Sequence, residues 1–154
     1  KALSFMFEYI SNDGNNYLHA VSSLLVEALS NRDTVHRQIS ATTIKHVGLG
    51  IEGCGHYIAL MHFMNFLWPN IYEQSPHVFF AVKEAIHGIQ ISLGVGHIFC
   101  YYLLGLFHPA RRVRESHWDM YNNSLKYSGG QFHPYYTSRL NSSSSTQKKC
   151  MLFL

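Results

Sequence analysis

Apolar residues recur at three- and four-residue spacing along most of the chain, which is the pattern of a helix with one buried face. The two-residue alternation of a half-buried strand is nowhere sustained. Turn residues separate the periodic stretches into about seven short helices. The pattern predicts an all-α fold. The clearest periodic positions are Tyr17, Val21, Leu24, Leu25 and Ala28, then Val35, Ile39 and Ile44, then Val78, Val82, Ile86 and Ile89.

The predicted helices form pairs, because a cap residue or a proline followed by a valine recurs at the start of every second helix. Asp33 is a predicted N-cap before Val35, and Pro76 and Pro109 suit the first turn of the helices that carry Val78 and Val113. The three valines lie at a spacing that irregular two-helix solenoid repeats use. We therefore expect a HEAT-repeat α-solenoid of stacked antiparallel helix pairs. The pairs are expected at residues 16–50, 55–93 and 96–126, behind a leading half-repeat at residues 1–11.

Stacked repeats bury their faces against their neighbours, so each repeat depends on the next one for its core. We expect residues 1–126 to be the repeat domain and residues 127–154 to be a partly disordered tail, with serines 142–145 exposed. Residues 1–11 are expected to expose an apolar face where an upstream repeat packs. The valines and isoleucines expected between the layers are Val35, Ile39, Val78, Val82, Ile86 and Val113.

The charge content fits this picture. Only 14% of the 154 residues are Asp, Glu, Lys or Arg, against roughly 25% in an average soluble domain. Many faces are therefore expected to be covered, and the chain is interpreted as a piece of a larger protein. Residues 110–154 contain seven Lys or Arg and two Asp or Glu, so the end of the chain is basic. A basic surface suits nucleic acid, an acidic protein or anionic lipid.

A polytopic membrane protein is an alternative, because residues 53–72 and 85–110 lack all four charged residue types. Each stretch is long enough to span a bilayer. Both contain histidines and other polar residues that a spanning helix seldom carries. The favoured interpretation is buried helix faces, with no membrane partner.

Eleven histidines raise the question of a metal site or a general base. The only closely spaced thiol and imidazole ligands are Cys54, His56 and His62, and a zinc site there needs a fourth ligand. No nucleophile elbow or phosphate-binding loop occurs, since the glycines of residues 48–55 follow a helix and are expected to form a loop. We expect no metal, no cofactor and no enzymatic activity, with a small metal-dependent enzyme as the rival hypothesis.

The strongest surface signal is a basic cluster at the start of the last helix. Arg111 and Arg114 share a helix face with Trp118, which predicts a cationic patch beside an aromatic ring. The candidate contacts with a protein partner or RNA are Arg111, Arg112, Arg114, Trp118 and Lys126. The alternative is a solvated helix face in which Arg114 pairs with Glu115 or Asp119.

Four stretches, at residues 3–10, 33–38, 68–78 and 105–122, carry a specific resemblance. The two longest read WPNIYEQSPHV and GLFHPARRVRESHWDMYN. In this order they resemble the C-terminal HEAT repeats of the splicing factor 3B subunit 1 family, over about residues 1–122. The tail and the loop near Glu52 depart from that family, so a diverged HEAT-repeat interaction module without a splicing role is kept as an alternative.

The resemblance implies a nuclear, non-catalytic scaffold of the U2 snRNP that supports branch-site recognition in pre-mRNA splicing. The implied protein partners are other splicing factor 3b subunits, namely a large β-propeller subunit and a small zinc-knuckle-like subunit. The implied RNA partner is the duplex of U2 snRNA and the branch site, gripped by the full-length scaffold. The branch-adenosine pocket of the family lies mainly upstream of these repeats, so no residue here is assigned to it.

Overall fold

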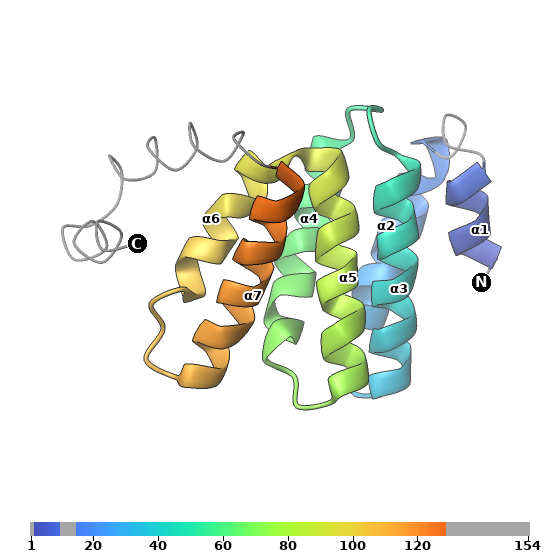
Figure 1. Cartoon of the computed structure of the whole chain (residues 1–154). Helices are drawn as coiled ribbons and strands as arrows, with labels where there is room; N and C mark the ends of the chain where they lie inside the picture. Colours follow the sequence, from blue (N-terminus) through green and yellow to red (C-terminus); the bar gives the residue numbers. More distant parts are fainter. Residues whose placement is uncertain (1, 10–14, 129–154) are drawn as a thin grey trace. The chain divides into compact units, whose positions relative to one another are not determined.

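The computed structural model describes residues 2–9 and 15–128, which form seven α-helices and one short 3-10 helix and contain no strand (Figure 1). These described residues divide into two compact units, one that ends at Leu93 and one that begins at Gly94. The elements are α1 (Ala2–Tyr9), α2 (Asn15–Leu29), α3 (Thr34–Gly50), α4 (Tyr57–Leu67), the 3-10 helix η1 (Trp68–Tyr72), α5 (Pro76–Leu93), α6 (Val95–Gly105) and α7 (Arg111–Ser128).

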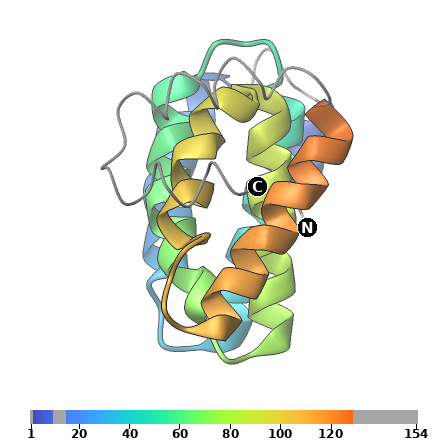
Figure 2. The ribbon, with the colours of Figure 1, turned by 60° about the vertical axis from the view of Figure 1, so that its left-hand side comes forward.

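The first unit has two layers of helices. Helices α1, α3 and α5 form one layer, in which α3 contacts both α1 and α5, while α2 and α4 contact each other in the second layer (Figures 1 and 2). A short turn joins α2 to α3, and η1 followed by a short turn joins α4 to α5, so the helices of each pair run antiparallel. Their inner faces bury a core that includes Ile44, Phe63 and Ile86, each at most 1% exposed.

Local signals in the sequence set several helix ends. The carboxylate of the N-cap residue Asp33 accepts a hydrogen bond from the Val35 amide at 2.9 Å and lies 2.6 Å from His36 Nδ1. Together these contacts lower the pKa of Asp33, the amide bond most strongly. Helix α5 begins at Pro76, where a missing N–H costs nothing. The expected cap at Asp33 and the expected first-turn proline of α5 are therefore confirmed.

Helices α3 and α5 approach each other closely, and this approach depends on two glycines. A Cβ atom on Gly48 would lie 2.9 Å from the carbonyl carbon of Gly88, and a Cβ on Gly88 would lie 2.8 Å from the Lys45 carbonyl oxygen. The Ser92 hydroxyl also donates a hydrogen bond to the Gly48 carbonyl. The expectation that Gly48 lies in a loop is wrong, because α3 continues to Gly50.

The loop itself begins after Ile51 and contains Gly53 and Gly55, whose φ angles are +77° and +78°. This left-handed region is strained for residues with a Cβ atom, so the two glycines allow the chain to turn from α3 into α4.

Some of the residues that were predicted to be buried between the layers are buried, and others are exposed. Val78 and Val82 are fully buried, and Ile86 is 1% exposed, as expected. Val35 and Ile39 were expected to be buried, but they are 55% and 56% exposed. They lie near the start of α3, whereas α1, the neighbour of α3 in its layer, has only eight residues. The described residues therefore leave this part of α3 uncovered. Val113 is intermediate between buried and exposed.

The second unit contains α6 and α7, which pack together as an antiparallel pair. Gly94, with φ +80°, is the N-cap of α6. Tyr102 is 1% exposed and accepts a hydrogen bond from the Ser124 hydroxyl at 2.8 Å, which ties the two helices together. Burial raises the pKa of Tyr102 to about 12, so this hydroxyl is neutral at physiological pH.

The paired helices confirm the predicted all-α, HEAT-type solenoid fold. The helices lie in the segments that the hydrophobic pattern indicated. The division into a repeat domain of residues 1–126 and a tail of residues 127–154 stays a prediction. Helix α7 extends to Ser128, and the tail from residue 129 onward, serines 142–145 included, lies outside the described residues.

Candidate functional site

The basic cluster lies at the turn between α6 and α7. The carbonyl of Ala110 accepts hydrogen bonds from the amides of Val113 and Arg114, both at 3.2 Å, and thereby starts the helix. The Ala110 amide in turn lies 3.1 Å from Nδ1 of His108. Pro109 was expected in the first turn of α7, but the helix begins at Arg111 and Pro109 lies in the turn that precedes it.

Arg114 is engaged within this turn. Its Nη1 donates to the carbonyls of His108 at 2.8 Å and Pro109 at 2.7 Å, and the residue is half-buried. A guanidinium in this position satisfies carbonyls that the turn leaves without helical partners. Arg114 therefore stabilises the α6–α7 turn. The suggested pairing of Arg114 with Glu115 or Asp119 is replaced by these backbone contacts.

Arg111 and Arg112 lie on the exposed part of the first turn of α7. Nε of Arg111 is 2.6 Å from Glu115 Oε1, an ion pair one helical turn apart, with the two side chains 84% and 61% exposed. The hydrogen bond to Glu115 raises the pKa of Arg111, so its charge is retained. Three arginines in the first turn oppose the helix dipole, and the Glu115 carboxylate offsets part of that repulsion.

The remaining two candidate residues lie further along α7. Trp118 is half-buried and packs edge-on against Tyr121, with the ring centroids 5.6 Å apart. The Tyr121 ring lies 6.3 Å from that of Phe99, which extends the aromatic contact to α6. Lys126 is exposed in the last turn, where a cation interacts favourably with the helix dipole. The aromatic partner of Trp118 is thus Tyr121.

A buried histidine that no spacing pattern in the sequence singled out lies beneath this surface. His117 is fully buried, its Nδ1 lies 2.8 Å from the Val113 carbonyl, and a Cβ on Gly105 would lie 2.2 Å from its Nε2. Burial lowers the pKa of His117, and the nearby His108 adds to this effect, while the Val113 carbonyl works against it. The neutral ring thus fills the space that Gly105 leaves between α6 and α7.

The candidate metal ligands do not converge in the part of the chain that the structure describes. Within residues 2–9 and 15–128, no three His, Cys, Asp or Glu side chains are placed to hold a metal ion. His62, one of the candidate zinc ligands, packs edge-on against Phe66 with ring centroids 5.0 Å apart. The expectation that the protein has no enzymatic activity stays a prediction.

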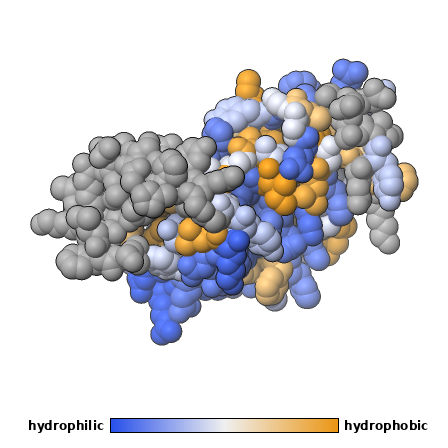
Figure 3. Space-filling model, turned by 45° about the horizontal axis from the view of Figure 1, so that its top comes forward, coloured by the Kyte–Doolittle hydropathy of each residue, from blue (hydrophilic) through white to orange (hydrophobic). Residues whose placement is uncertain are grey.

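The membrane alternative is tested by the helices themselves. In the described part of the chain, every helix is either too short or too polar to cross a bilayer. On the face shown in Figure 3, hydrophobic residues form separate patches among hydrophilic ones. This finding counts against the polytopic membrane alternative.

Among the curated proteins that match this chain, two do so over most of its length. The U2 snRNP component prp10 of Schizosaccharomyces pombe is 49% identical over 136 residues, which is 88% of this chain. The U2 snRNP component HSH155 of Saccharomyces cerevisiae is 46% identical over 123 residues, or 80% of this chain. The chain belongs to the family of these U2 snRNP components. No family model matches it.

Membership of this U2 snRNP component family confirms the resemblance drawn from the sequence. The match with prp10 spans 136 residues, so it extends beyond residues 1–122, which carry the resemblance. The chain corresponds to 11% of the length of prp10 and 13% of that of HSH155.

Proposed function

We propose that this chain is a non-catalytic scaffold segment of the U2 snRNP, within its splicing factor 3b complex, and that it supports branch-site recognition in pre-mRNA splicing in the nucleus. The observation that carries the proposal is the 46–49% identity to two U2 snRNP components over 80–88% of the chain. The helix pairs support it, because stacked pairs build extended surfaces on which partners dock.

The proposed protein partners are the large β-propeller subunit and the small zinc-knuckle-like subunit of the same complex. The duplex of U2 snRNA and branch site is bound through the full-length scaffold. Among the candidate residues, Arg111, Arg112 and Lys126 present charge at the surface. Arg114 and Trp118 act mainly by holding the α6–α7 turn and the aromatic contacts beneath it in place.

We propose that the exposed cations bind an acidic surface of a protein partner. Binding of these cations to RNA is the other possible outcome of the test below. A phosphate-binding surface needs several uncompensated cations close together. Here the Arg111 charge is shared with Glu115, and Arg114 is engaged with two backbone carbonyls. A cluster whose arginines are partly held by contacts within the chain suits a small number of ion pairs with a protein partner.

A chimera tests the proposed role. The matching segment of prp10 is replaced by this chain in fission yeast, and U2 snRNA is measured after precipitation of the tagged chimera. Recovery close to that of intact prp10 is expected. A prp10 lacking the segment is the negative control. A chimera that accumulates normally but recovers no U2 snRNA would support the alternative of an interaction module without a splicing role.

A single charge reversal tests the basic surface within the same chimera. Arg112→Glu is compared with Arg32→Glu, which reverses an exposed arginine between α2 and α3. We expect Arg112→Glu to weaken co-precipitation of the other splicing subunits and Arg32→Glu to leave it unchanged. If Arg112 binds phosphate instead, the variant will lower RNA affinity and flatten its dependence on salt by about one unit or less. If Arg112→Glu has no effect in either assay, the basic cluster is a solvated helix face that binds neither partner.

A further inference from the structure

A serine followed by a proline lies at the start of α5. Ser75 belongs to the short linker of residues 73–75 between η1 and α5, in which the backbone of Glu73 is extended. The chain has four prolines, and only Pro76 follows a serine or a threonine. Ser75 is half-buried, and both Pro76 and His77 are exposed. Kinases of one class require proline directly after the acceptor serine, because their site leaves an ordinary backbone N–H at that position without a partner.

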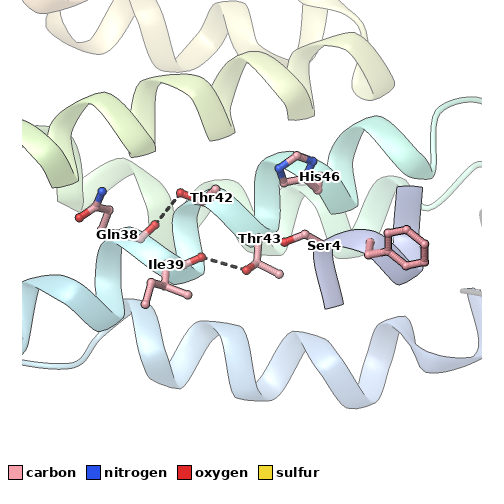
Figure 4. A pocket seen from close by; sticks show the side chains of 7 residues that line it. Ser4, Gln38, Ile39, Thr42, Thr43 and His46 are labelled. Carbon is pink, nitrogen blue, oxygen red and sulfur yellow. Dashed lines mark hydrogen bonds between the residues drawn. The ribbon is translucent and has the colours of Figure 1, made fainter. Parts of the chain in front are cut away.

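The hydroxyl of Ser75 is not used within the fold. By contrast, the hydroxyls of Thr42 and Thr43 in α3 donate to carbonyls of their own helix at 2.9 Å (Figure 4). In the part of the chain that the structure describes, the Ser75 hydroxyl makes no hydrogen bond, and its oxygen is accessible to solvent. Asp33, in the equivalent position before α3, caps its helix with its side chain. The Ser75 hydroxyl is therefore free to react.

An ion pair between α3 and the linker lies beside this serine. Nη1 of Arg37 contacts Oε2 of Glu73 and lies 3.4 Å from Oδ1 of Asn70, so Arg37 links η1 and the linker to α3. The Glu73 carboxylate also accepts hydrogen bonds from the amide of Gln74, at 3.0 Å, and from that of Ser75. The bond from Gln74, followed by the contact with Arg37, lowers the pKa of Glu73, so the carboxylate is charged. The Arg37 guanidinium and the Ser75 backbone thus meet at one carboxylate.

We propose that Ser75 is phosphorylated by a protein kinase that requires proline after the acceptor serine, and that the phosphate then competes with Glu73 for Arg37. In this reaction the Ser75 oxygen forms a bond to the γ-phosphorus of ATP, and the bond from that phosphorus to the bridging oxygen breaks. ADP leaves, and the hydroxyl proton passes to the base of the kinase. The proposal does not depend on the proposed role in splicing.

The competition for Arg37 follows from the charge of the phosphate. A phosphoserine carries a charge of about −1.5 to −2 near pH 7 and three acceptor oxygens, so it is a stronger partner for a guanidinium than a carboxylate is. Nε of Arg37 has no partner among the described residues, so the guanidinium has a donor to spare. The phosphate would also repel the Glu73 carboxylate, which lies two positions away.

The kinase needs only the end of α5 to open, since a kinase binds its substrate in an extended conformation. The first helical hydrogen bond of α5 joins the Phe79 amide to the Ser75 carbonyl at 3.0 Å. The first buried residue of this helix is Val78, which follows the Ser-Pro pair and His77. Opening of one terminal turn costs much less free energy than global unfolding. We therefore expect the folded chain to be a substrate.

The first test is incubation of the folded 154-residue chain with ATP and a purified mitogen-activated protein kinase, followed by mass spectrometry. We expect one phosphate on Ser75, which both Ser75→Ala and Pro76→Ala abolish. Ser30, an exposed serine followed by Asn31, is the internal control and should stay unmodified. A peptide of residues 70–82 gives the reference rate, and the folded chain should react at most about a hundredfold more slowly.

The second test is a phosphorus NMR titration of the phosphorylated chain. Contact with Arg37 should place the second pKa of the phosphate about 0.5 unit or more below its value in the phosphorylated peptide. Arg37→Gln should return this pKa toward the peptide value, whereas Arg32→Gln, at an exposed arginine between α2 and α3, should not change it. If Arg37→Gln does not fold, the comparison of the original chain with the peptide still decides.

Two sets of results would overturn the proposal. Phosphate uptake that persists in Pro76→Ala, or that needs urea concentrations at which the chain unfolds, would show that Ser75 is not a site for this class of kinase. A phosphate pKa equal to that of the peptide, or one that Arg37→Gln leaves unchanged, would show that the phosphate does not compete for Arg37.

Discussion

Replacing Gly88 with alanine tests the packing of α3 against α5. The added Cβ would lie 2.8 Å from the carbonyl oxygen of Lys45, and 3.3 Å and 3.4 Å from its Cα and carbonyl carbon. All three contacts are with backbone atoms of the opposite helix. A flexible side chain cannot relieve them, so the two helices must move apart. Separation would also weaken the hydrogen bond from Ser92 to the Gly48 carbonyl.

Two opposing contributions to the free energy of unfolding set the size of the change in stability. Alanine in place of glycine within a helix stabilises the folded state by about 0.5 to 1 kcal/mol. Forcing an extra methyl group into a packed contact costs about 1 to 3 kcal/mol, and here the contact is with backbone. We expect Gly88→Ala to lower the free energy of unfolding by about 1 to 2 kcal/mol. The double variant with Gly48→Ala should lose less than the sum of the two single changes, because helices that have moved apart admit both methyl groups.

The assay is urea unfolding of the 154-residue chain, followed by circular dichroism, with the denaturant slope checked for constancy. Gly50→Ala is the matched control, since Gly50 ends α3 and its φ is not in the left-handed region. It should leave the stability unchanged or raise it slightly. A Gly88→Ala variant as stable as the original chain would refute the reasoning, because it would mean that α3 and α5 do not approach so closely.

Three further changes probe other parts of the fold. Asp33→Ala should lower the urea midpoint and Asp33→Asn should largely preserve it, since asparagine can still cap α3; equal losses would contradict the capping role. Arg114→Ala should lower the free energy of unfolding by about 1 kcal/mol, because it removes two hydrogen bonds to carbonyls, whereas Arg111→Ala should change the urea midpoint little. A larger loss for Arg111→Ala than for Arg114→Ala would show that the turn does not depend on Arg114. Because the folded-state pKa of His117 lies below its ordinary value of 6.5, stability should be complete above pH 6.5 and fall as the pH decreases through the lowered pKa. Urea midpoints at pH 7.5 and 5 should therefore differ more in the original chain than in a folded His117→Gln variant, and equal differences would exclude this linkage.

The sequence was sufficient to predict the helices and the features that depend on residues close together along the chain. The three- and four-residue periodicity located the helices, and Asp33 marked the start of α3. The ion pair of Arg111 with Glu115 follows from a four-residue spacing, although the alternative considered from the sequence was a pairing of Arg114 with Glu115 or Asp119.

Features that depend on tertiary contacts could not be read in the same way. Gly48 and Gly88 meet although 40 positions separate them, and nothing in the local pattern distinguishes such a glycine from one in a loop. Periodicity identifies the apolar side of α3 but not the length of the neighbour that covers it, so Val35 and Ile39 were wrongly expected to be buried. The contacts of Arg114 depend on how the turn presents two carbonyls, which residue spacing does not reveal.

The central claim is that this chain serves as a scaffold segment in splicing. It is tested most directly by measuring how efficiently transcripts are spliced. The measurement is the ratio of unspliced to spliced RNA in fission yeast whose only prp10 carries this chain in place of its matching segment. We predict a ratio close to that of cells with intact prp10. Accumulation of unspliced transcripts would contradict the account, provided that the chimera is present at normal abundance and that the isolated chain unfolds cooperatively.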